Sequence, residues 1–101
     1  MTETVWIHCA RPRPHWYEKS EDERTRLRRR WGDIGVESER DGARSLGPYH
    51  VRGQHDFETV EIWVFASAQR AFDHWARLTA AGYSEWFAFA NTIGLKAEAP
   101  A

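Results

Sequence analysis

The sequence is poor in cysteine and proline, with one cysteine and four prolines in 101 residues. The lone Cys9 cannot form an internal disulfide or a cysteine-based metal site. No apolar run approaches the roughly 20 residues that a bilayer requires, and no charged region followed by an apolar region stands at the start. The formal net charge of -1 supplies no global basic field for nucleic acid. We therefore expect a cytoplasmic protein that binds neither nucleic acid nor a membrane.

Aromatic residues are what the sequence has in excess, above all six tryptophans. Hydrophobic residues make up 42% and charged residues 29% of the chain, a composition that excludes disorder. A chain of 101 residues normally forms one domain, which buries a smaller share of its surface than a larger domain does. The sequence predicts one globular domain over 1–95, a disordered tail over 96–101, and a benefit from burial against a partner subunit.

Two strand-like segments divide their side chains between an aliphatic face and an aromatic face. Side chains alternate strictly along a strand, so the two classes cannot share a surface. The aliphatic set, on one face, is Val5, Ile7, Cys9, Val60, Ile62 and Val64. The set on the aromatic face is Trp6, His8, Ala10, Glu61, Trp63 and Phe65. The second set combines large rings with one titratable group on each strand, which is typical of an apolar small-molecule pocket with a proton-transfer pair.

The predicted elements follow the order strand, helix, strand, strand, helix, strand. The strands are expected at 4–10, 43–52, 58–66 and 86–93, with a short helical turn over 83–85 before the last. This order is the ferredoxin-like β-α-β-β-α-β plan, an α+β fold in which a four-stranded antiparallel sheet carries two helices on one face.

Polar caps and glycines mark the ends of the two helices. Ser20 opens a capping box before the first helix, and Ser67 is a matching cap for the second. Gly32 and Gly35 are expected to fray the end of the first helix, whereas Gly82 follows the second helix as its stop.

The two sheet faces are expected to have different covers. Helices pack on an aliphatic face, so we expect them on the aliphatic set defined above. That choice leaves Trp6, Trp63 and Phe65 without an internal cover. Burying a large apolar side chain is worth roughly 1.5–3 kcal/mol. The sequence therefore predicts a homodimer built on the aromatic face, or a cover supplied by the C-terminal segment.

The chain resembles the dimeric α+β barrel superfamily. The resemblance rests on the element order, on an aromatic third strand, and on a closing segment. The third strand reads EIWVF over 61–65, and the closing segment reads GYSEWF over 82–87, followed by Asn91 and Gly94. The resemblance implies ferredoxin-like units that pair sheet to sheet, with a small-molecule site between each sheet and its helices or loops.

The superfamily narrows architecture more than chemistry. Its members include cofactor-independent monooxygenases, lactone isomerases, polyketide cyclases, haem-handling enzymes and proteins without known activity. The Asn-Trp-Tyr set of the quinone-forming monooxygenases and the axial haem histidine of the chlorite dismutase branch have no definite counterparts in this sequence.

His8 and Glu61 are the leading candidates for proton transfer. The first and third strands are neighbours in this topology, and the two residues share a face with the aromatic set, so a buried acid-base pair is geometrically allowed. The alternative is a structural ion pair or hydrogen bond buried at a dimer interface, which requires the same residues.

The loop after the first strand holds a second aromatic cluster. It contains His15, Trp16 and Tyr17 and follows two stiffening prolines. The cluster either forms a lid that orders when a ligand binds or simply tucks against the body of the domain.

Other polar residues are interpreted as structural or solvated. His50, His55 and Asp56 match no metal-binding spacing, so no metal is predicted. The arginine run 28–30 is compensated by nearby carboxylates and is interpreted as a solvated helix face. His74 is expected on the surface or half-buried on the second helix. The apolar residues at helical spacing are interpreted as core rather than as a cofactor site, namely Trp31, Phe72, Trp75 and Leu78.

The residues together favour a small cofactor-independent enzyme that acts on an apolar aromatic or polycyclic compound by general acid-base chemistry. His8 is the expected base, Glu61 orients it or acts as the acid, and Tyr49 or Asn91 donates to an oxyanion. The substrate-binding candidates are Trp6, Trp16, Tyr17, Tyr49, Trp63, Phe65, Trp86, Phe89 and Asn91. Isomerisation, cyclisation, elimination and cofactor-free oxygenation are all compatible with this set. The alternatives are a non-catalytic ligand- or haem-binding homodimer and a purely structural homodimer.

Overall fold

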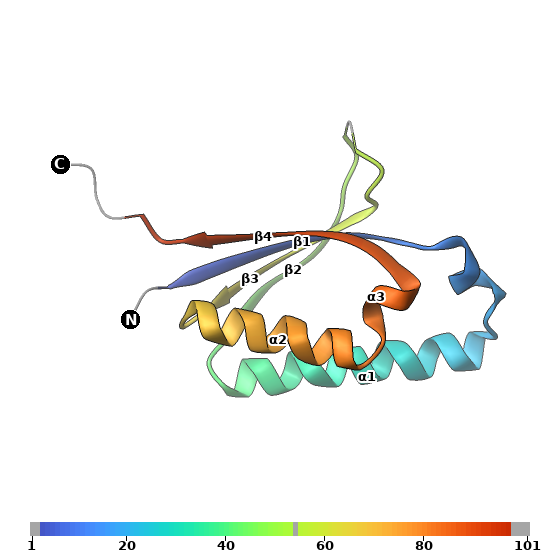
Figure 1. Ribbon diagram of the computed structural model, residues 1–101, viewed down its shortest axis with the longest axis horizontal. Coiled ribbons are helices and arrows are strands. Elements are labelled where there is room, and N and C mark those ends of the chain that lie inside the picture. The colour runs from blue at the N-terminus through green and yellow to red at the C-terminus, as the bar shows by residue number, and fades with distance from the viewer. Residues whose placement is uncertain (1–2, 54, 98–101) are drawn as a thin grey trace.

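The computed structural model describes residues 3–53 and 55–97, and it is a ferredoxin-like α+β domain. The elements are β1 (Thr4–Pro12), the 3-10 helix η1 (Pro14–Glu18), α1 (Glu21–Arg40), β2 (Arg44–His50), β3 (Thr59–Phe65), α2 (Ala68–Ala80), α3 (Tyr83–Trp86) and β4 (Phe87–Leu95). The four strands form one antiparallel sheet in the order β2-β3-β1-β4. Helices α1 and α2 lie side by side on one face of this sheet (Figure 1). The predicted fold class is confirmed, and residues 98–101 of the expected tail lie outside the described residues.

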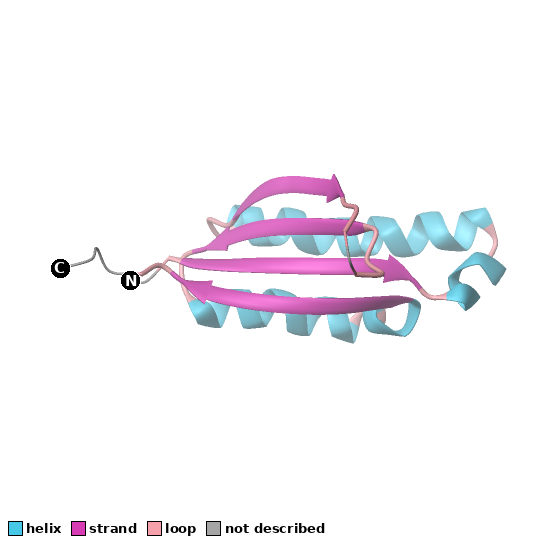
Figure 2. Cartoon of the chain, turned by 90° about the horizontal axis from the view of Figure 1, so that it is seen from above, coloured by secondary structure: helices cyan, strands magenta, loops and turns pink. Residues whose placement is uncertain are grey.

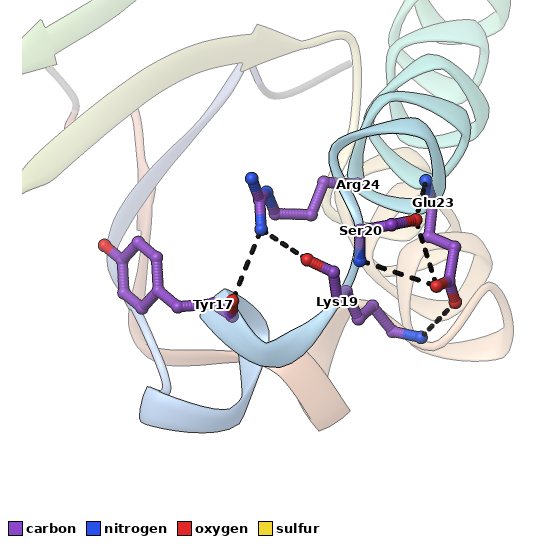
Figure 3. Close-up of polar contacts among 5 residues, drawn as sticks. All are labelled: Tyr17, Lys19, Ser20, Glu23 and Arg24. Atoms are coloured by element: carbon purple, nitrogen blue, oxygen red, sulfur yellow. Dashed lines mark hydrogen bonds and ion pairs between the residues drawn. The ribbon is translucent and has the colours of Figure 1, made fainter.

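Helix α1 begins at the predicted capping box, which Figure 3 shows in detail. The Ser20 hydroxyl accepts from the Glu23 amide at 3.2 Å, and the Glu23 carboxylate accepts from the Ser20 amide at 3.5 Å. Lys19 Nζ donates to the same carboxylate at 3.3 Å. Arg24 Nη1 donates to the backbone oxygens of Lys19 and Tyr17 at 2.5 and 3.5 Å. These bonds tie the end of η1 to the first turn of α1.

The sequence predicted that the first helix frays at Gly32 and Gly35, and this prediction was wrong. The helix continues to Arg40. A Cβ atom on Gly35 would lie 3.3 Å from Cη2 of Trp63, tighter than ordinary van der Waals contact. Gly35 therefore lets α1 approach the sheet closely. Packing against β3 outweighs the low helix propensity of glycine.

The ends of α2 match the sequence prediction. The Ser67 hydroxyl accepts from the Arg70 amide at 3.3 Å. Gly82 follows the helix with a φ of 82°, the left-handed conformation that favours glycine.

The helices cover the aromatic face of the sheet, so the predicted assignment of the two faces was wrong. Trp6, Trp63 and Phe65 are all buried within the chain. The His74 ring on α2 lies 5.1, 4.9 and 5.3 Å from their rings, measured between centroids. Large rings bury the most area per side chain, and α2 packs the ring of His74 against them, with Ala71 also buried on this helix. A homodimer built on these rings is thereby excluded.

Two predictions for α2 change with this packing. Phe72, expected in the core from its helical spacing, is 54% exposed, and His74, expected at the surface, is 2% exposed. The buried positions of α2 are Ala71, His74 and Leu78, a stripe that leaves Phe72 on the solvent side.

The opposite face of the sheet carries the aliphatic set. Val5, Ile7 and Cys9 of β1 pair across the sheet with Val64, Ile62 and Val60 of β3. Seen from above in Figure 2, the strands lie on the viewer's side of the helices. We call this surface the outer face. Within residues 3–53 and 55–97, no helix has the length and apolar character needed to cross a bilayer.

Candidate functional site

A buried histidine network lies between the sheet and the helices. His8 of β1 is 1% exposed, and both of its ring nitrogens are hydrogen-bonded. Nδ1 lies 2.6 Å from Oδ1 of Asn91 on β4, and Nε2 lies 2.7 Å from the hydroxyl oxygen of Tyr83 on α3. Asn91 is the register partner of His8 on the neighbouring strand. The consecutive elements α3 and β4, both far from β1 in sequence, thus converge on one imidazole.

Donor and acceptor counting defines the direction of these bonds. Oδ1 of Asn91 is an acceptor, so Nδ1 of His8 must carry the proton and donate it. Burial lowers the pKa of His8 despite the opposing effects of Asn91 and Glu61, which keeps the ring neutral at pH 7. Nε2 is then a bare acceptor, and the Tyr83 hydroxyl donates to it. Burial, aided by Glu61, raises the pKa of Tyr83, so the phenol stays protonated.

Glu61 lies on β3 directly opposite His8 in the strand register. Its Oε1 accepts from Nε1 of Trp63 at 3.3 Å, and it makes no direct hydrogen bond with His8. Its charge nevertheless reaches the network, because it raises the pKa values of His8 and Tyr83 alike. Glu61 therefore acts on His8 through space.

A cleft of about 420 Å³ opens between α1, α2 and the sheet beside this network. Its volume lies in the range typical of small-molecule sites. The aromatic and aliphatic lining comes from Trp31, Trp63, His74, Leu78, Tyr83 and Phe87, and the other lining residues are Arg28, Gly32, Gly35, Glu39, Ser45, Thr59 and Glu61. Tyr83 lines the cleft and also bonds His8, so it connects the cleft with the buried imidazole.

The structure brings together only some of the predicted site residues. Glu61 and Trp63 line the cleft. His8 does not line it but is hydrogen-bonded to Tyr83, which does, and Asn91 is hydrogen-bonded to His8. Trp6 stacks on His8 with ring centroids 4.8 Å apart, which makes it a support of the network rather than part of the cleft wall.

The other predicted pocket residues lie elsewhere. Trp16 is fully buried against Trp31 and Phe87, as expected if the aromatic loop tucks against the body. Trp86 packs on His15 under the ammonium of Lys19. The remaining candidates outside the cleft are Phe65 beside two other cavities, Phe89 against Trp75, Tyr17 in η1 at 63% exposed, and Tyr49 on β2 at 52% exposed. Tyr49 pairs with Val60 and so belongs to the outer face, away from the cleft.

Sequence reasoning missed three important residues of this site. Trp31 and Leu78 were interpreted as core only, and Tyr83 as part of a helical turn. The antiparallel pairing of β1 with β4 places Asn91 opposite His8. The predicted fold makes these two strands neighbours, whereas their register comes from the structure. No local signal places the Tyr83 hydroxyl on His8, because their contact spans 75 positions.

A second polar cluster joins α1 to α2 behind the cleft. The Ser38 hydroxyl lies 2.6 Å from Nδ1 of His74, and Nη2 of Arg77 donates to the same hydroxyl at 2.8 Å. Burial, with smaller effects from the charges of Arg77 and His8, lowers the pKa of His74 to about 4. His74 is therefore neutral at pH 7 and joins the two helices through Ser38.

Metal binding finds no support in the described part of the chain. Over residues 3–53 and 55–97, no three His, Cys, Asp or Glu side chains are grouped closely enough to hold a metal ion.

Comparison with solved structures identifies the fold. A mutant chlorite dismutase from Candidatus Nitrospira defluvii, in complex with cyanide, superposes with a TM-score of 0.78 at 9% identity, over 97% of this chain and 41% of the other. A dimeric protein of unknown function and ferredoxin-like fold from Bacteroides fragilis NCTC 9343 superposes with a TM-score of 0.56 at 10% identity, over 93% of this chain and 96% of the other. No protein-family model and no curated protein matches the sequence.

These similarities are of fold rather than of chemistry. The chain spans about two fifths of the length of the chlorite dismutase that it matches. It has the ferredoxin-like α+β fold that chlorite dismutase-like proteins and ferredoxin-like dimeric proteins share.

Proposed function

We propose that this protein binds a small aromatic molecule in the cleft between its helices and its sheet and carries out general acid-base chemistry on it without a cofactor. The proposal rests on the position of Tyr83, which lines the cleft and whose hydroxyl donates a hydrogen bond to the buried His8. An apolar cleft with a few convergent polar groups is the ordinary form of a small-molecule site. The cytoplasm is the location that we propose.

The geometry supports a two-step proton relay. A proton leaving the substrate moves to the Tyr83 oxygen, while the hydroxyl proton of Tyr83 moves to Nε2 of His8. The imidazolium that forms still donates its Nδ1 proton to Oδ1 of Asn91 and is stabilised by the Glu61 carboxylate. His8 is then the base, as the sequence predicted, but it acts through Tyr83 rather than by touching the substrate. In reverse, the same relay delivers a proton.

Hydrogen-deuterium exchange of 2-tetralone tests the relay. This bicyclic aromatic ketone has acidic C–H groups, and ¹H NMR in D₂O follows their exchange. We expect the wild type to accelerate the exchange, and Tyr83→Phe or His8→Gln to lower the rate by about 10²–10⁴-fold, the usual contribution of general acid-base catalysis. The matched control is His55→Gln, which replaces an exposed histidine that does not line the cleft.

The folded state of each variant is checked by near-ultraviolet circular dichroism. Exchange no faster than the buffer background, with 2-tetralone bound in the cleft, would exclude acid-base turnover of ketones. Unfolding of both variants together would assign a structural role to the Tyr83–His8 bond.

Ligand binding without turnover is the second candidate function. It is favoured by the saturation of both His8 nitrogens inside the protein, since a fully bonded histidine can serve structure alone. The histidines beside the cleft do not fit the axial ligand of a haem. His8 has no free nitrogen, and His74 is 2% exposed among three aromatic rings.

We further propose that two copies pair through the outer face, in place of the aromatic face predicted from the sequence. The outer face carries aliphatic residues on paired strands, and the helices lie on the other side of the sheet in Figure 2. The similar protein from Bacteroides fragilis is itself dimeric. A contiguous apolar surface of this kind marks an interaction site.

Substitution at the centre of the outer face should break the dimer. Ile62→Glu places a charge on the strand that pairs with β1 at Ile7, and we expect it to give a folded monomer. Phe72→Glu, which adds the same charge on the exposed side of α2, should stay dimeric. Light scattering at micromolar concentration measures both, and a wild type that is already monomeric would overturn the proposal.

A further inference from the structure

The charge of the cleft indicates which class of aromatic ligand it takes. Its lining contains two carboxylates, Glu39 and Glu61, against one guanidinium, that of Arg28. His74 also lines the cleft but is neutral at pH 7, because its pKa is lowered to about 4. An aromatic cleft with an excess of negative charge attracts a positively charged ligand.

Glu61 has no cationic partner within the described residues 3–53 and 55–97. The ion pairs there join Lys19, Arg44, Arg70 and Arg77 to other carboxylates. Arg28, the cation of the cleft, places its guanidinium carbon 5.3 Å from the centre of the Trp16 ring. Glu61 is only partly exposed, and its one direct hydrogen bond is from the Trp63 indole. A carboxylate withdrawn from water is normally paired, so Glu61 is available for a cation from outside.

Aromatic rings surround the space next to this carboxylate. Trp63, which bonds Glu61, lines the cleft together with Trp31, Tyr83 and Phe87. The Trp31 ring meets those of Tyr83 and Phe87 edge-on, at centroid distances of 5.0 and 5.7 Å. Rings grouped in this way attract ammonium groups through their quadrupoles.

We propose that the ligand of this cleft is an aromatic amine, bound in its protonated form with the ammonium group on Glu61 and the ring among Trp31, Trp63 and Phe87. This inference rests on the proposed function and names the substrate class of the same cleft. The amine replaces the water that a half-buried carboxylate otherwise retains, and Trp63 orients the carboxylate by its indole bond.

Calorimetry with three naphthalene compounds tests the inference. The probes are naphthalen-2-ylmethylamine, naphthalen-2-ylmethanol and naphthalene-2-carboxylate, which share a ring system and differ in charge. At pH 7.5 we expect the amine to bind at least about tenfold more tightly than the alcohol, and the carboxylate to bind most weakly. Glu61→Gln should abolish the advantage of the amine, so that the amine and the alcohol bind this variant with similar affinity.

The matched control is Glu58→Gln, which removes an equal charge from an exposed residue that does not line the cleft. An equal loss in this variant would assign the preference to overall charge and overturn the inference. Loss of the preference in Glu39→Gln, with no change in Glu61→Gln, would place the ammonium elsewhere and also overturn it.

Failure of the inference and failure of the proposed function give different results. If the alcohol binds as tightly as the amine, and Trp31→Ala weakens both, the cleft is the binding site but its ligand is not an amine. If none of the compounds binds the wild type, or Trp31→Ala leaves binding unchanged, the proposed function fails at this cleft as well.

Discussion

Trp6→Ala should lower the free energy of unfolding by about 3–5 kcal/mol, the usual cost of truncating a buried tryptophan. Trp6 is 1% exposed and contacts the rings of His8, Phe65, His74 and Trp75. Its removal leaves a cavity at the centre of the aromatic layer and withdraws the ring on which His8 stacks. Urea unfolding followed by far-ultraviolet circular dichroism measures the loss.

Phe72→Ala is the control for this prediction. Phe72 is 54% exposed on the solvent side of α2, so its truncation should change the free energy of unfolding by no more than about 0.5 kcal/mol. Equal losses in the two variants would contradict the assignment of faces and restore Phe72 to the core, where the sequence alone placed it.

Acidification should destabilise the protein through His74. Its folded-state pKa of about 4 lies below the unfolded value of 6.5, so the unfolded chain binds the proton first. The stability that neutral His74 contributes is complete above pH 6.5, declines as the pH falls, and is lost once the pH passes below the folded pKa. At about 1.4 kcal/mol per pKa unit, the decline amounts to about 3 kcal/mol. Burial is the main cause of the shift, and the charges of Arg77 and His8 add to it.

Urea unfolding of the wild type and of His74→Gln between pH 4 and 7 measures this dependence. The free energy of unfolding of the wild type should fall more steeply with acid than that of the variant. The difference in slope corresponds to the uptake of up to one more proton on unfolding. His8 contributes in the same direction, because burial lowers its pKa too, so a residual slope is expected in the variant. His50→Gln, at an exposed position, should keep the wild-type slope. Parallel curves for the wild type and His74→Gln would contradict the prediction.

Several features of the fold were predictable because they depend on neighbouring residues. The capping box at Ser20, the cap at Ser67 and the left-handed Gly82 are local hydrogen-bond and backbone effects, and the structure contains all three. The period of two along β1 and β3 separates rings from aliphatic side chains in the structure as in the sequence. The order of the elements then leaves few topologies, of which the ferredoxin-like sheet is the one observed.

The candidate site was only partly predictable, because part of it depends on packing between elements that are distant in sequence. Strand parity and the predicted strand order place His8 and Glu61 on one face of neighbouring strands, as the structure has them. The register that sets Asn91 opposite His8 comes from the structure. The positions of the Tyr83 hydroxyl and of Trp31 in the cleft wall depend on how α3 and α1 pack against the sheet. Neither position has a pattern in the chain that points to it.

By itself, the sequence determined the elements, their order and the division of the sheet into an aromatic and an aliphatic face, because turns, caps and alternation act over a few residues. The tertiary structure alone decided which face the helices cover. That choice depends on whether the side chains of α2 fit around Trp6, Trp63 and Phe65, and His74 fits there. Fit between elements far apart in the chain is a matter of shape and volume, which alternation does not encode.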